Sequence, residues 1–332
     1  MKGLPDPALP LALDEAERVF GEILDGDAAD DDIAQFLIGM TDRSETSDEI
    51  AGAARALRAR LLPVDAPEDA IDCCGTGGDG HHTLNVSTAV SLVVSAAGVP
   101  VAKHGNRAAS SKSGAADTLE ALGLDMEAAG RTAEASLAKL GICFLFAKNH
   151  HPAMGRIQPI RQRIGKRTIF NLMGPLSNPA GVRRQLIGIA RPAYVPIYAR
   201  AKAMLGTDRT FIVSGDEGLD ELSLAGGNEL ADVNSLSFSM QRVDAELAGL
   251  PHAPVEAIRG GDPQHNARAL KALLDGVPGP YRDAVVFNAA ATLIVSGKVD
   301  DWRTGAQLAS DILDRGAARQ KLADWIALVD AT

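Results

Sequence analysis

The segment GTGGDG, residues 75–80, places four glycines directly after a short apolar run that ends at Cys74. Glycine allows sharp backbone turns and lets N–H groups approach a ligand with no side chain between them. Asn85–Thr88 then opens the apolar run Val86–Val101, which predicts a buried helix, and the free N–H groups at a helix start favour a phosphate. The pattern indicates a phosphate-binding loop, although a glycine-rich turn with a serine cap also explains these residues.

A second polar segment follows the next expected strand, at residues 101–114 with the sequence VAKHGNRAASSKSG. Lys103, Arg107 and Lys112 are interleaved here with glycine, serine and asparagine. This arrangement suits contact with a polyanion better than an ordinary solvated face. Ser113 is expected to cap the helix that follows, which adds a second helix start able to attract an anion.

Four carboxylates gather in the segment SGDEGLDELS, at Asp216, Glu217, Asp220 and Glu221. In isolation such a string is most simply a solvated turn with helix-capping acids. Beside two phosphate-seeking loops it instead favours a Mg²⁺ site, because Mg²⁺ is typically held by one or two carboxylates together with substrate phosphates.

Histidines, aromatic residues and prolines alternate in a fourth segment, which runs from NHHPAM at residues 149–154 to TIFNLMGPLSNP at residues 168–179. These residue types suit a pocket for a flat organic acid. Arg161 and Arg167 lie between the two strings. The planar guanidinium of either one can bind a carboxylate through two parallel hydrogen bonds.

The elements that must position these segments change character near residue 70. Residues 1–62 alternate amphipathic helical patterns with aspartate-rich turns and give no strand signal, which predicts a small all-helical unit. Beyond it, strand-like runs alternate with helical ones such as Ser113–Leu122 and Pro192–Leu205, which predicts an α/β domain with a largely parallel central sheet. The expected strands are Ala70–Cys74, Pro100–Ala102, Ile142–Phe146, Thr210–Ser214 and Asp283–Phe287. In such sheets, ligands bind in the loops beyond the carboxyl ends of the strands.

Composition sets further limits. The 332 residues are 46% apolar and 23% charged, as in an ordinary soluble globular protein with a large core. A formal charge of −10 argues against a nucleic-acid-binding surface, but it permits an anionic small molecule in a locally positive pocket. Cys73 and Cys74 are most simply the end of a buried strand, since three cysteines make no secreted disulfide framework. With no signal-peptide pattern and no membrane-spanning run, the chain is expected to be cytoplasmic, with no membrane partner.

Taken together and in this order, the four segments resemble the anthranilate phosphoribosyltransferases, a family related to the pyrimidine nucleoside phosphorylases. The matching strings are GTGGDG with NVST, VAKHGNRAASSKSGAADTLEALG, HHPAM with RTIFNLMGPLSNPA, and GLDELS. GTGGD is shared among relatives, whereas KHGN and RTIFNLMGPLSNPA are far more specific. The similarity covers nearly the whole chain.

The resemblance implies an architecture of the nucleoside phosphorylase/phosphoribosyltransferase type. A small helical domain, residues 1–68 with a contribution from about 167–180, is hinged to a large α/β catalytic domain, residues 69–332, that binds phosphoribosyl pyrophosphate. Family members are usually homodimers joined through faces of the helical domain. The implied Mg²⁺-dependent reaction transfers the 5-phosphoribosyl group of phosphoribosyl pyrophosphate to the amine of anthranilate and releases pyrophosphate. This is the second step of tryptophan biosynthesis from chorismate.

The site residues of the family carry over by motif. The phosphoribosyl pyrophosphate site is expected to comprise Gly75, Gly77, Gly78, Asp79, Thr83, Asn85, Ser87, Thr88, Lys103 and Ala115. The anthranilate side is expected to comprise Gly75, His104, Asn106, His151, Arg161 and Pro175, with Arg161 nearest the carboxylate. The expected contacts to Mg²⁺ are Ser87, Asp220 and Glu221, and the expected catalytic residues are Lys103 and Asp79.

One departure from the family pattern is Ala115, which stands where many relatives carry serine, so one hydroxyl contact is absent. An aromatic amine is already neutral and nucleophilic at neutral pH, so His104 and His151 are expected to position the acceptor rather than to act as a base. Two alternatives stay open. A pyrimidine nucleoside phosphorylase would share the fold and the glycine-rich loop but use free phosphate, and a non-catalytic, nucleic-acid-binding relative is disfavoured by the negative charge.

Overall fold

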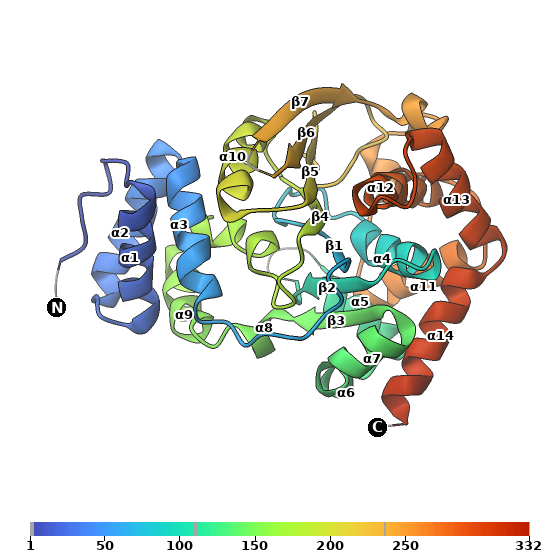
Figure 1. The fold of residues 1–332 in the computed structure, drawn as a ribbon, viewed down its shortest axis with the longest axis horizontal. Coiled ribbons are helices and arrows are strands. Elements are labelled where there is room, and N and C mark those ends of the chain that lie inside the picture. Colours follow the sequence, from blue (N-terminus) through green and yellow to red (C-terminus); the bar gives the residue numbers. More distant parts are fainter. Residues whose placement is uncertain (1–2, 109–111, 236, 332) are drawn as a thin grey trace.

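The structure, a computed structural model, describes residues 3–108, 112–235 and 237–331 (Figure 1). Residues 109–111, which belong to the predicted cationic segment, therefore lie outside the described residues. The centre of the molecule is a seven-stranded sheet with the order β3-β2-β1-β4-β5-β6-β7. Its strands are β1 (Ile71–Gly75), β2 (Val101–Gly105), β3 (Ile142–Phe146), β4 (Arg184–Gly188), β5 (Arg209–Gly215), β6 (Asn228–Asn234) and β7 (Ser237–Val243).

Strands β1 to β5 pair in parallel, whereas β6 and β7 continue the sheet in antiparallel fashion. The predicted α/β class with a mostly parallel sheet is thereby confirmed. Gly75 is in register with Gly188, and Gly105 with Phe146, so the carboxyl ends of the parallel strands meet at one edge. Both Cys73 and Cys74 lie in β1, as the strand pattern predicts.

The larger apolar core packs α4 (Val86–Ala96) and α12 (Pro280–Ser296) against one face of the sheet. Helix α4 begins behind the glycine-rich loop, and nearly all of its residues are buried. In Figure 1 this side also carries the red C-terminal helices. The remaining helices of the α/β part are α5 (Ala115–Ala121), α6 (Met126–Arg131), α7 (Ala133–Leu140), α8 (Ala147–His150), α10 (Val195–Leu205), α11 (Pro263–Leu274), α13 (Trp302–Asp314) and α14 (Ala317–Asp330).

The prediction of a strand at Asp283–Phe287 is wrong, because these residues form part of α12. Every residue from Ala284 to Val295 is buried, so the apolar run is far longer than a strand needs. Pro280 at the helix start, with its fixed φ, also favours a helix. Tertiary burial on all sides therefore outweighs the strand propensity of the valines.

The helical unit lies at the left of Figure 1 and is built from separate parts of the chain. Helices α1 (Leu13–Asp25), α2 (Asp30–Arg43) and α3 (Ser47–Arg58) share one apolar core with α9 (Met154–Ile164) and with the short 3₁₀ helix η1 (Ile169–Leu172). The ring of Phe20 meets that of Phe170 edge-on at 5.8 Å. This core also extends onto α10 and the inner strands. The domain ranges 1–68 and 69–332 stay a prediction; the packing adds α9, which the sequence pattern did not assign to this unit.

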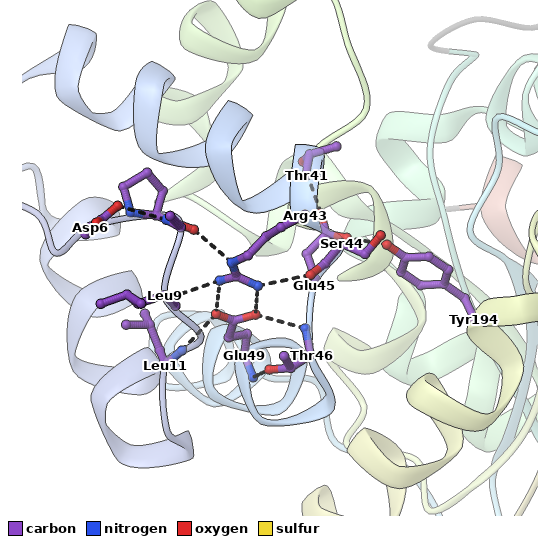
Figure 2. Close-up of polar contacts among 12 residues, drawn as sticks. Asp6, Leu9, Leu11, Thr41, Arg43, Ser44, Glu45, Thr46, Glu49 and Tyr194 are labelled. Atoms are coloured by element: carbon purple, nitrogen blue, oxygen red, sulfur yellow. Dashed lines mark hydrogen bonds and ion pairs between the residues drawn. The ribbon is translucent and has the colours of Figure 1, made fainter.

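The half-buried Arg43 forms an ion pair with the fully buried Glu49 where α2 is joined to α3 (Figure 2). Both carboxylate oxygens of Glu49 face the guanidinium, and they also accept hydrogen bonds from the N–H groups of Leu11 at 2.9 Å and Thr46 at 2.8 Å. The Thr46 hydroxyl in turn accepts from the Glu49 N–H, which completes a capping box at the start of α3. Every polar atom of the Glu49 carboxylate is thus satisfied by the protein itself.

Figure 2 also shows a contact that joins the helical unit to the α/β part. The hydroxyl of Tyr194, just before α10, donates to Glu45 at 2.7 Å. The remaining 3₁₀ helices are η2 (Pro175–Ser177), η3 (Pro192–Tyr194), η4 (Ala245–Ala248) and η5 (Val255–Ile258). Within the described ranges, no helix combines the length and the apolar composition needed to cross a membrane.

Candidate active site

Glycine shapes the loop after β1 in two ways. Gly77 and Gly78 have φ values of +71° and +72°, which glycine adopts without strain. At Gly75 the constraint is space, because a Cβ atom there would lie 2.1 Å from Oδ2 of Asp220. The same oxygen accepts a hydrogen bond from the Gly77 N–H at 2.6 Å, across 143 residues of sequence. The glycine-rich loop therefore wraps around a carboxylate of the acidic segment.

Lys103 links three elements beneath this loop. Its Nζ donates to the Cys73 carbonyl of β1 at 2.8 Å and to the Ser87 hydroxyl of α4 at 3.2 Å. The Ser87 N–H donates to Oε1 of Glu221 at 3.2 Å, so Glu221 occupies one donor of the helix start. Lys103 is only 2% exposed, which leaves its charge little screened by solvent.

The carboxylates at this edge carry more negative charge than the nearby lysine can offset. Burial raises the pKa of Asp220 well above its usual value, and the neighbouring carboxylates of Asp79 and Glu221 add to that rise. Burial also raises the pKa of Glu221 to about 7, although Lys103 and the N–H of Ser87 oppose the shift. A divalent cation would relieve this excess, because it favours the ionised form of both carboxylates.

The Ser87 hydroxyl and the carboxylates of Asp220 and Glu221 fit the oxygen ligands that Mg²⁺ prefers. Among the residues that the structure describes, no group of three or more His, Cys, Asp or Glu side chains forms a complete metal cage. This suits Mg²⁺, which commonly takes one or two carboxylates and completes its shell with water and substrate phosphates. The donor set therefore fits a metal that arrives with a phosphorylated substrate.

The other two acids of the segment have structural partners. Asp216 is exposed and pairs with Arg242 at 2.6 Å. Glu217 accepts a hydrogen bond from the hydroxyl of Ser223. Of the four acid side chains in the string, only those of Asp220 and Glu221 hydrogen-bond to the glycine-rich loop or the α4 start within the described part of the chain.

Asn85, at the start of α4, is held by three residues that sequence reasoning missed. Its Oδ1 accepts from the Thr118 hydroxyl at 2.5 Å and from Nδ2 of Asn266 at 2.9 Å, and its carbonyl accepts from the Tyr281 hydroxyl at 3.1 Å. These partners come from α5, α11 and α12. Nothing local in the sequence relates them to Asn85, since only the fold brings the three helices together.

Asp72 is a further residue of the site that none of the sequence motifs includes. It is fully buried in β1 and accepts hydrogen bonds from the His104 N–H at 3.2 Å and from Nδ2 of Asn178 at 2.9 Å. Burial raises its pKa, while Lys103 and these hydrogen bonds act in the opposite direction. A signal was present in this case, because an acid inside an apolar strand next to a glycine-rich loop requires a specific partner.

His104 and His151 lie together, with 3.2 Å between their Nε2 atoms. Nδ1 of His104 faces the Gly174 carbonyl at 3.0 Å. A carbonyl only accepts, so His104 carries its proton on Nδ1. Burial lowers the pKa of His104 to about 4 and that of His151 to about 3. Both rings are therefore neutral at pH 7, and the pair braces the turn before Pro175.

The two candidate arginines have different surroundings. Nη1 of Arg167 donates to the carbonyls of Gly77 at 2.8 Å and Gly78 at 2.9 Å, so this side chain is tied to the glycine-rich loop. Arg161, on α9, has no hydrogen-bond acceptor or ion-pair partner among the described residues. Burial lowers the pKa of Arg161, and the charge of Arg167 lowers it further. Arg161 is therefore the guanidinium that remains available for a carboxylate.

The remaining predicted residues lie on neighbouring elements. Thr83 forms an isolated bridge with Arg259, and Thr88 is buried in the first turn of α4. Asn106 follows β2, and its Oδ1 accepts from the N–H of Arg107 at 2.8 Å. Pro175 is buried at the start of η2, and Ala115 begins α5.

The expected Ser113 cap of α5 is wrong. Gly114 is the N-cap residue, and the carboxylate of Asp117 accepts from its N–H and from that of Ala108, each at 2.9 Å. The hydroxyl of Ser113 instead lies 2.9 Å from that of Thr118. The acid inside the first turn replaces the serine because it reaches both backbone donors.

Comparison with known proteins places this site in a family. The chain matches the glycosyl transferase family, helical bundle domain, over residues 9–61, and the glycosyl transferase family, a/b domain, over residues 67–319. Anthranilate phosphoribosyltransferase of Erythrobacter litoralis is 77% identical over 328 residues, which cover 99% of each chain. The crystal structure of anthranilate phosphoribosyltransferase from Thermus thermophilus is 39% identical, with a TM-score of 0.92 over 97% of each chain.

The enzyme of Saccharomyces cerevisiae, solved in complex with phosphoribosyl pyrophosphate and Mg, is 30% identical. Its TM-score is 0.87, and the match covers 96% of this chain and 93% of that chain. Sequence and fold thus agree along the whole length, from the helical unit to the strand-end site. The chain belongs to the anthranilate phosphoribosyltransferases of this glycosyl transferase family.

Proposed function

We propose that the chain transfers the 5-phosphoribosyl group of phosphoribosyl pyrophosphate to the amine of anthranilate and releases pyrophosphate, the second step of tryptophan biosynthesis from chorismate. One observation carries the proposal: a glycine-rich loop, a buried lysine and an under-compensated carboxylate pair meet at one sheet edge. The relatives at 77% and 39% identity are named for this activity.

The donor side is assigned to the loop after β1 and to the first turn of α4. Departure of pyrophosphate builds positive charge on the ribose and negative charge on the diphosphate. The positive ammonium of Lys103 and the N–H groups of residues 75–80 would stabilise the negative charge on the diphosphate. The negative carboxylate of Asp79 would stabilise the positive charge on the ribose. Gly75, Gly77, Gly78, Thr83, Asn85, Ser87, Thr88 and Ala115 complete the proposed donor site.

Ser87, Asp220 and Glu221 would hold Mg²⁺. When bound, the ion supplies positive charge to the diphosphate oxygens. The raised pKa values of Asp220 and Glu221 support this assignment, because a cation is the partner that these carboxylates lack. The yeast relative was solved with phosphoribosyl pyrophosphate and Mg.

The acceptor side is assigned to Gly75, His104, Asn106, His151, Arg161 and Pro175. Arg161 would bind the anthranilate carboxylate through its planar guanidinium. The neutral histidine pair would hold the turn at Pro175, and no charged base is needed for an amine that is already nucleophilic.

We also propose that residues 1–68, with about 167–180, close over residues 69–332 and exclude water, which would otherwise compete with the amine. A cytoplasmic homodimer joined through faces of the helical domain follows from the family resemblance. Sedimentation equilibrium tests the dimer: a monomer at micromolar concentration would contradict it.

The direct test follows the loss of anthranilate fluorescence on addition of phosphoribosyl pyrophosphate and Mg²⁺. Turnover supports the proposal. Phosphorolysis of thymidine or uridine without anthranilate turnover would favour the nucleoside phosphorylase, and salt-dependent DNA binding without turnover would favour the non-catalytic relative.

Arg161→Ala tests the acceptor assignment. It should raise the KM for anthranilate about a hundredfold, the loss expected for a charge-assisted bidentate contact, and change the KM for the donor little. Arg163→Ala is the matched control, since Arg163 lies on the same helix but is exposed and pairs with Asp31 at 3.1 Å. Equal effects of Arg161→Ala on both substrates would refute the carboxylate contact.

A further inference from the structure

A pocket of about 270 Å³ lies at the C-terminal end of α3, beside the η2 turn. We call it the hinge pocket; Pro63 and Arg183 lie at its exposed rim, and Pro175, Asn178 and Gln185 form its buried floor. The pocket can therefore be reached from solvent, while its floor belongs to the turn that carries the proposed acceptor residue Pro175.

Arg58 lines this pocket without a carboxylate partner. Its Nε donates to the Leu176 carbonyl at 2.5 Å, and its two terminal nitrogens have no acceptor among the described residues. Burial lowers the pKa of Arg58, and no carboxylate contributes to opposing that shift. The pair of terminal nitrogens is the part of the guanidinium that can grip a carboxylate with two parallel hydrogen bonds.

Lys202 adds a second cation directly behind the pocket wall. It is fully buried in α10, and its Nζ donates to Oε1 of Gln185, which lines the floor. No ion pair to Lys202 occurs within the described part of the chain. Burial, with a smaller effect from the charge of Arg58, lowers its pKa to about 7, while the charges of Cys74 and Asp72 oppose the shift.

The acids and the third cation around the pocket leave this positive charge in place. Arg183 at the rim pairs with Asp208 at 2.7 Å. Asp72 lies behind Asn178 and accepts hydrogen bonds from Asn178 and from the His104 N–H, rather than from Lys202 or Arg58. Among the described residues, the half-buried Arg58 and the buried Lys202 therefore have no carboxylate within hydrogen-bond or ion-pair distance, although the charge of Asp72 still acts on Lys202.

We propose that the hinge pocket binds a small organic anion, a carboxylate carried on a compact apolar body. The guanidinium of Arg58 would take the carboxylate, and the rings of Pro63, Pro175 and Pro179 with the side chains of Leu61, Val182 and Leu205 would enclose the apolar part. The volume lies just below the range of about 300–1,000 Å³ that is usual for drug-sized ligands, so one ring or a short chain fits.

Two hydrogen bonds connect this ligand to the acceptor side. Arg58 holds the Leu176 carbonyl, and Nε2 of Gln185 donates to the Pro175 carbonyl at 2.7 Å. An anion that draws Arg58 toward itself therefore loosens the η2 turn, and binding there would alter the KM for the acceptor. This consequence rests on the proposed function, whereas binding itself does not.

Calorimetric titration with benzoate tests the binding. Because the acceptor site is itself expected to take aromatic carboxylates, the titration is made in Arg161→Gln, where the proposed carboxylate contact of that site is removed. One binding event is expected, weakened at least tenfold when Arg58→Gln is added and unchanged with Arg60→Gln. Arg60 is a fair control, since it lies beside the same helix end and pairs with Asp25. Equal affinity in the Arg58→Gln and parent proteins would overturn the proposal.

Two measurements on the protein with intact Arg58 keep the test independent of whether Arg58→Gln folds. Nuclear Overhauser contacts are expected between the benzoate ring and the methyl groups of Val182 and Leu205, and their absence at saturation would overturn the site. An anion beside Lys202 raises its pKa, so binding near pH 7 should take up a fraction of a proton, seen as different heats in buffers of different ionisation enthalpy. Inorganic sulfate binding as tightly as benzoate would refute the organic anion. Turnover of the unsubstituted chain reports the proposed function separately.

Discussion

The cluster around Glu49 in the helical unit and the cluster of Asp220 and Glu221 at the sheet edge differ in how fully the protein compensates their negative charge. In the helical unit, burial alone would raise the pKa of Glu49, but hydrogen bonds from Arg43, Thr46 and Leu11 outweigh it and the pKa is lowered. At the sheet edge the pKa values of Asp220 and Glu221 are raised, despite the presence of Lys103. The charge of the Glu49 cluster is compensated within the protein, whereas the cluster of Asp220 and Glu221 has too little positive charge around it.

This difference separates a structural role from a binding role. Removing one partner of a compensated ion pair leaves the other charge without a partner inside the protein, so the expected loss is in stability. A cluster that lacks a counter-charge is destabilising on its own and becomes favourable only when a ligand supplies that charge. Substitutions in the two clusters should therefore move stability and activity in different directions.

The largest effect is expected for Lys103→Met. It removes the buried cation assigned to the departing diphosphate, and kcat/KM should fall about a thousandfold, or about 4 kcal/mol. Steady-state kinetics measure this, with Lys139→Met as the control because Lys139 is exposed on α7. A loss of less than tenfold would remove Lys103 from the proposed chemistry.

Glu49→Gln should lower the free energy of unfolding by about 3 kcal/mol, because it leaves the half-buried Arg43 without its counter-charge. The kinetic constants per folded molecule should not change. Urea unfolding measures the first quantity, and Glu15→Gln is the control, since Glu15 pairs with Arg18 only at the surface, at 3.9 Å. A fall in kcat with unchanged stability would reverse the assignment of the two clusters.

The double substitution Asp220→Asn with Glu221→Gln should act in the opposite sense. Stability without Mg²⁺ should rise by about 2 kcal/mol, because the fold disfavours the ionised form of both carboxyl groups and the amides have no such form. Activity should lose its dependence on Mg²⁺. Asp216→Asn serves as the control, as its carboxylate is exposed and paired with Arg242. If the Mg²⁺ titration is unchanged in the double variant, these residues do not hold the metal.

The pH dependence of stability should distinguish single variants of the two clusters. The pKa of Glu221 is raised in the folded state, so the native protein binds more protons, and this group adds stability as the pH falls from about 7 toward 4.5. Glu221→Gln should remove that gain, by up to about 1.4 kcal/mol per pH unit. The pKa of Glu49 is lowered, so its contribution is instead lost on further acidification, below its usual value of 4.5.

Denaturant unfolding at several pH values between about 5 and 8 compares Glu221→Gln with the unsubstituted chain. His104 and His151 have lowered pKa values, so both proteins should lose stability as the pH falls below about 6.5. That common loss cancels in the difference between them. Parallel curves over this window would show that Glu221 is ionised throughout.

The sequence predicted the loops of this site better than the interactions that hold them in place. Glycine-rich and charged segments after short apolar strands are local patterns, and parallel strands bring their carboxyl ends to one edge. The hydrogen bonds that hold Asn85 could not be predicted from local patterns, because Thr118, Asn266 and Tyr281 come from three separate helices. The hinge pocket escaped the sequence for the same reason: Arg58 and Lys202 look like ordinary helix residues until packing leaves them without an acid.

The strand expected at Asp283–Phe287 failed for a related physical reason. A short apolar run fits a buried strand and a buried helix equally well, and only the length of the surrounding run separates the two. In α12 that run continues to Val295. The helical domain could be read from its amphipathic repeats, but α9 carries few apolar residues, and its membership depends on Ile157 and Ile160 meeting the distant core.

The discontinuous helical unit has a consequence for the order of events during synthesis. Helices α1 to α3 leave the ribosome before α9 and Phe170. The apolar core in which Phe20 is buried is therefore completed only when those later residues have been synthesised. Until then the nascent chain carries an uncovered apolar face, which is the type of surface that molecular chaperones shield. The N-terminal helices therefore emerge first but reach their final packing only after most of the parallel strands have been made.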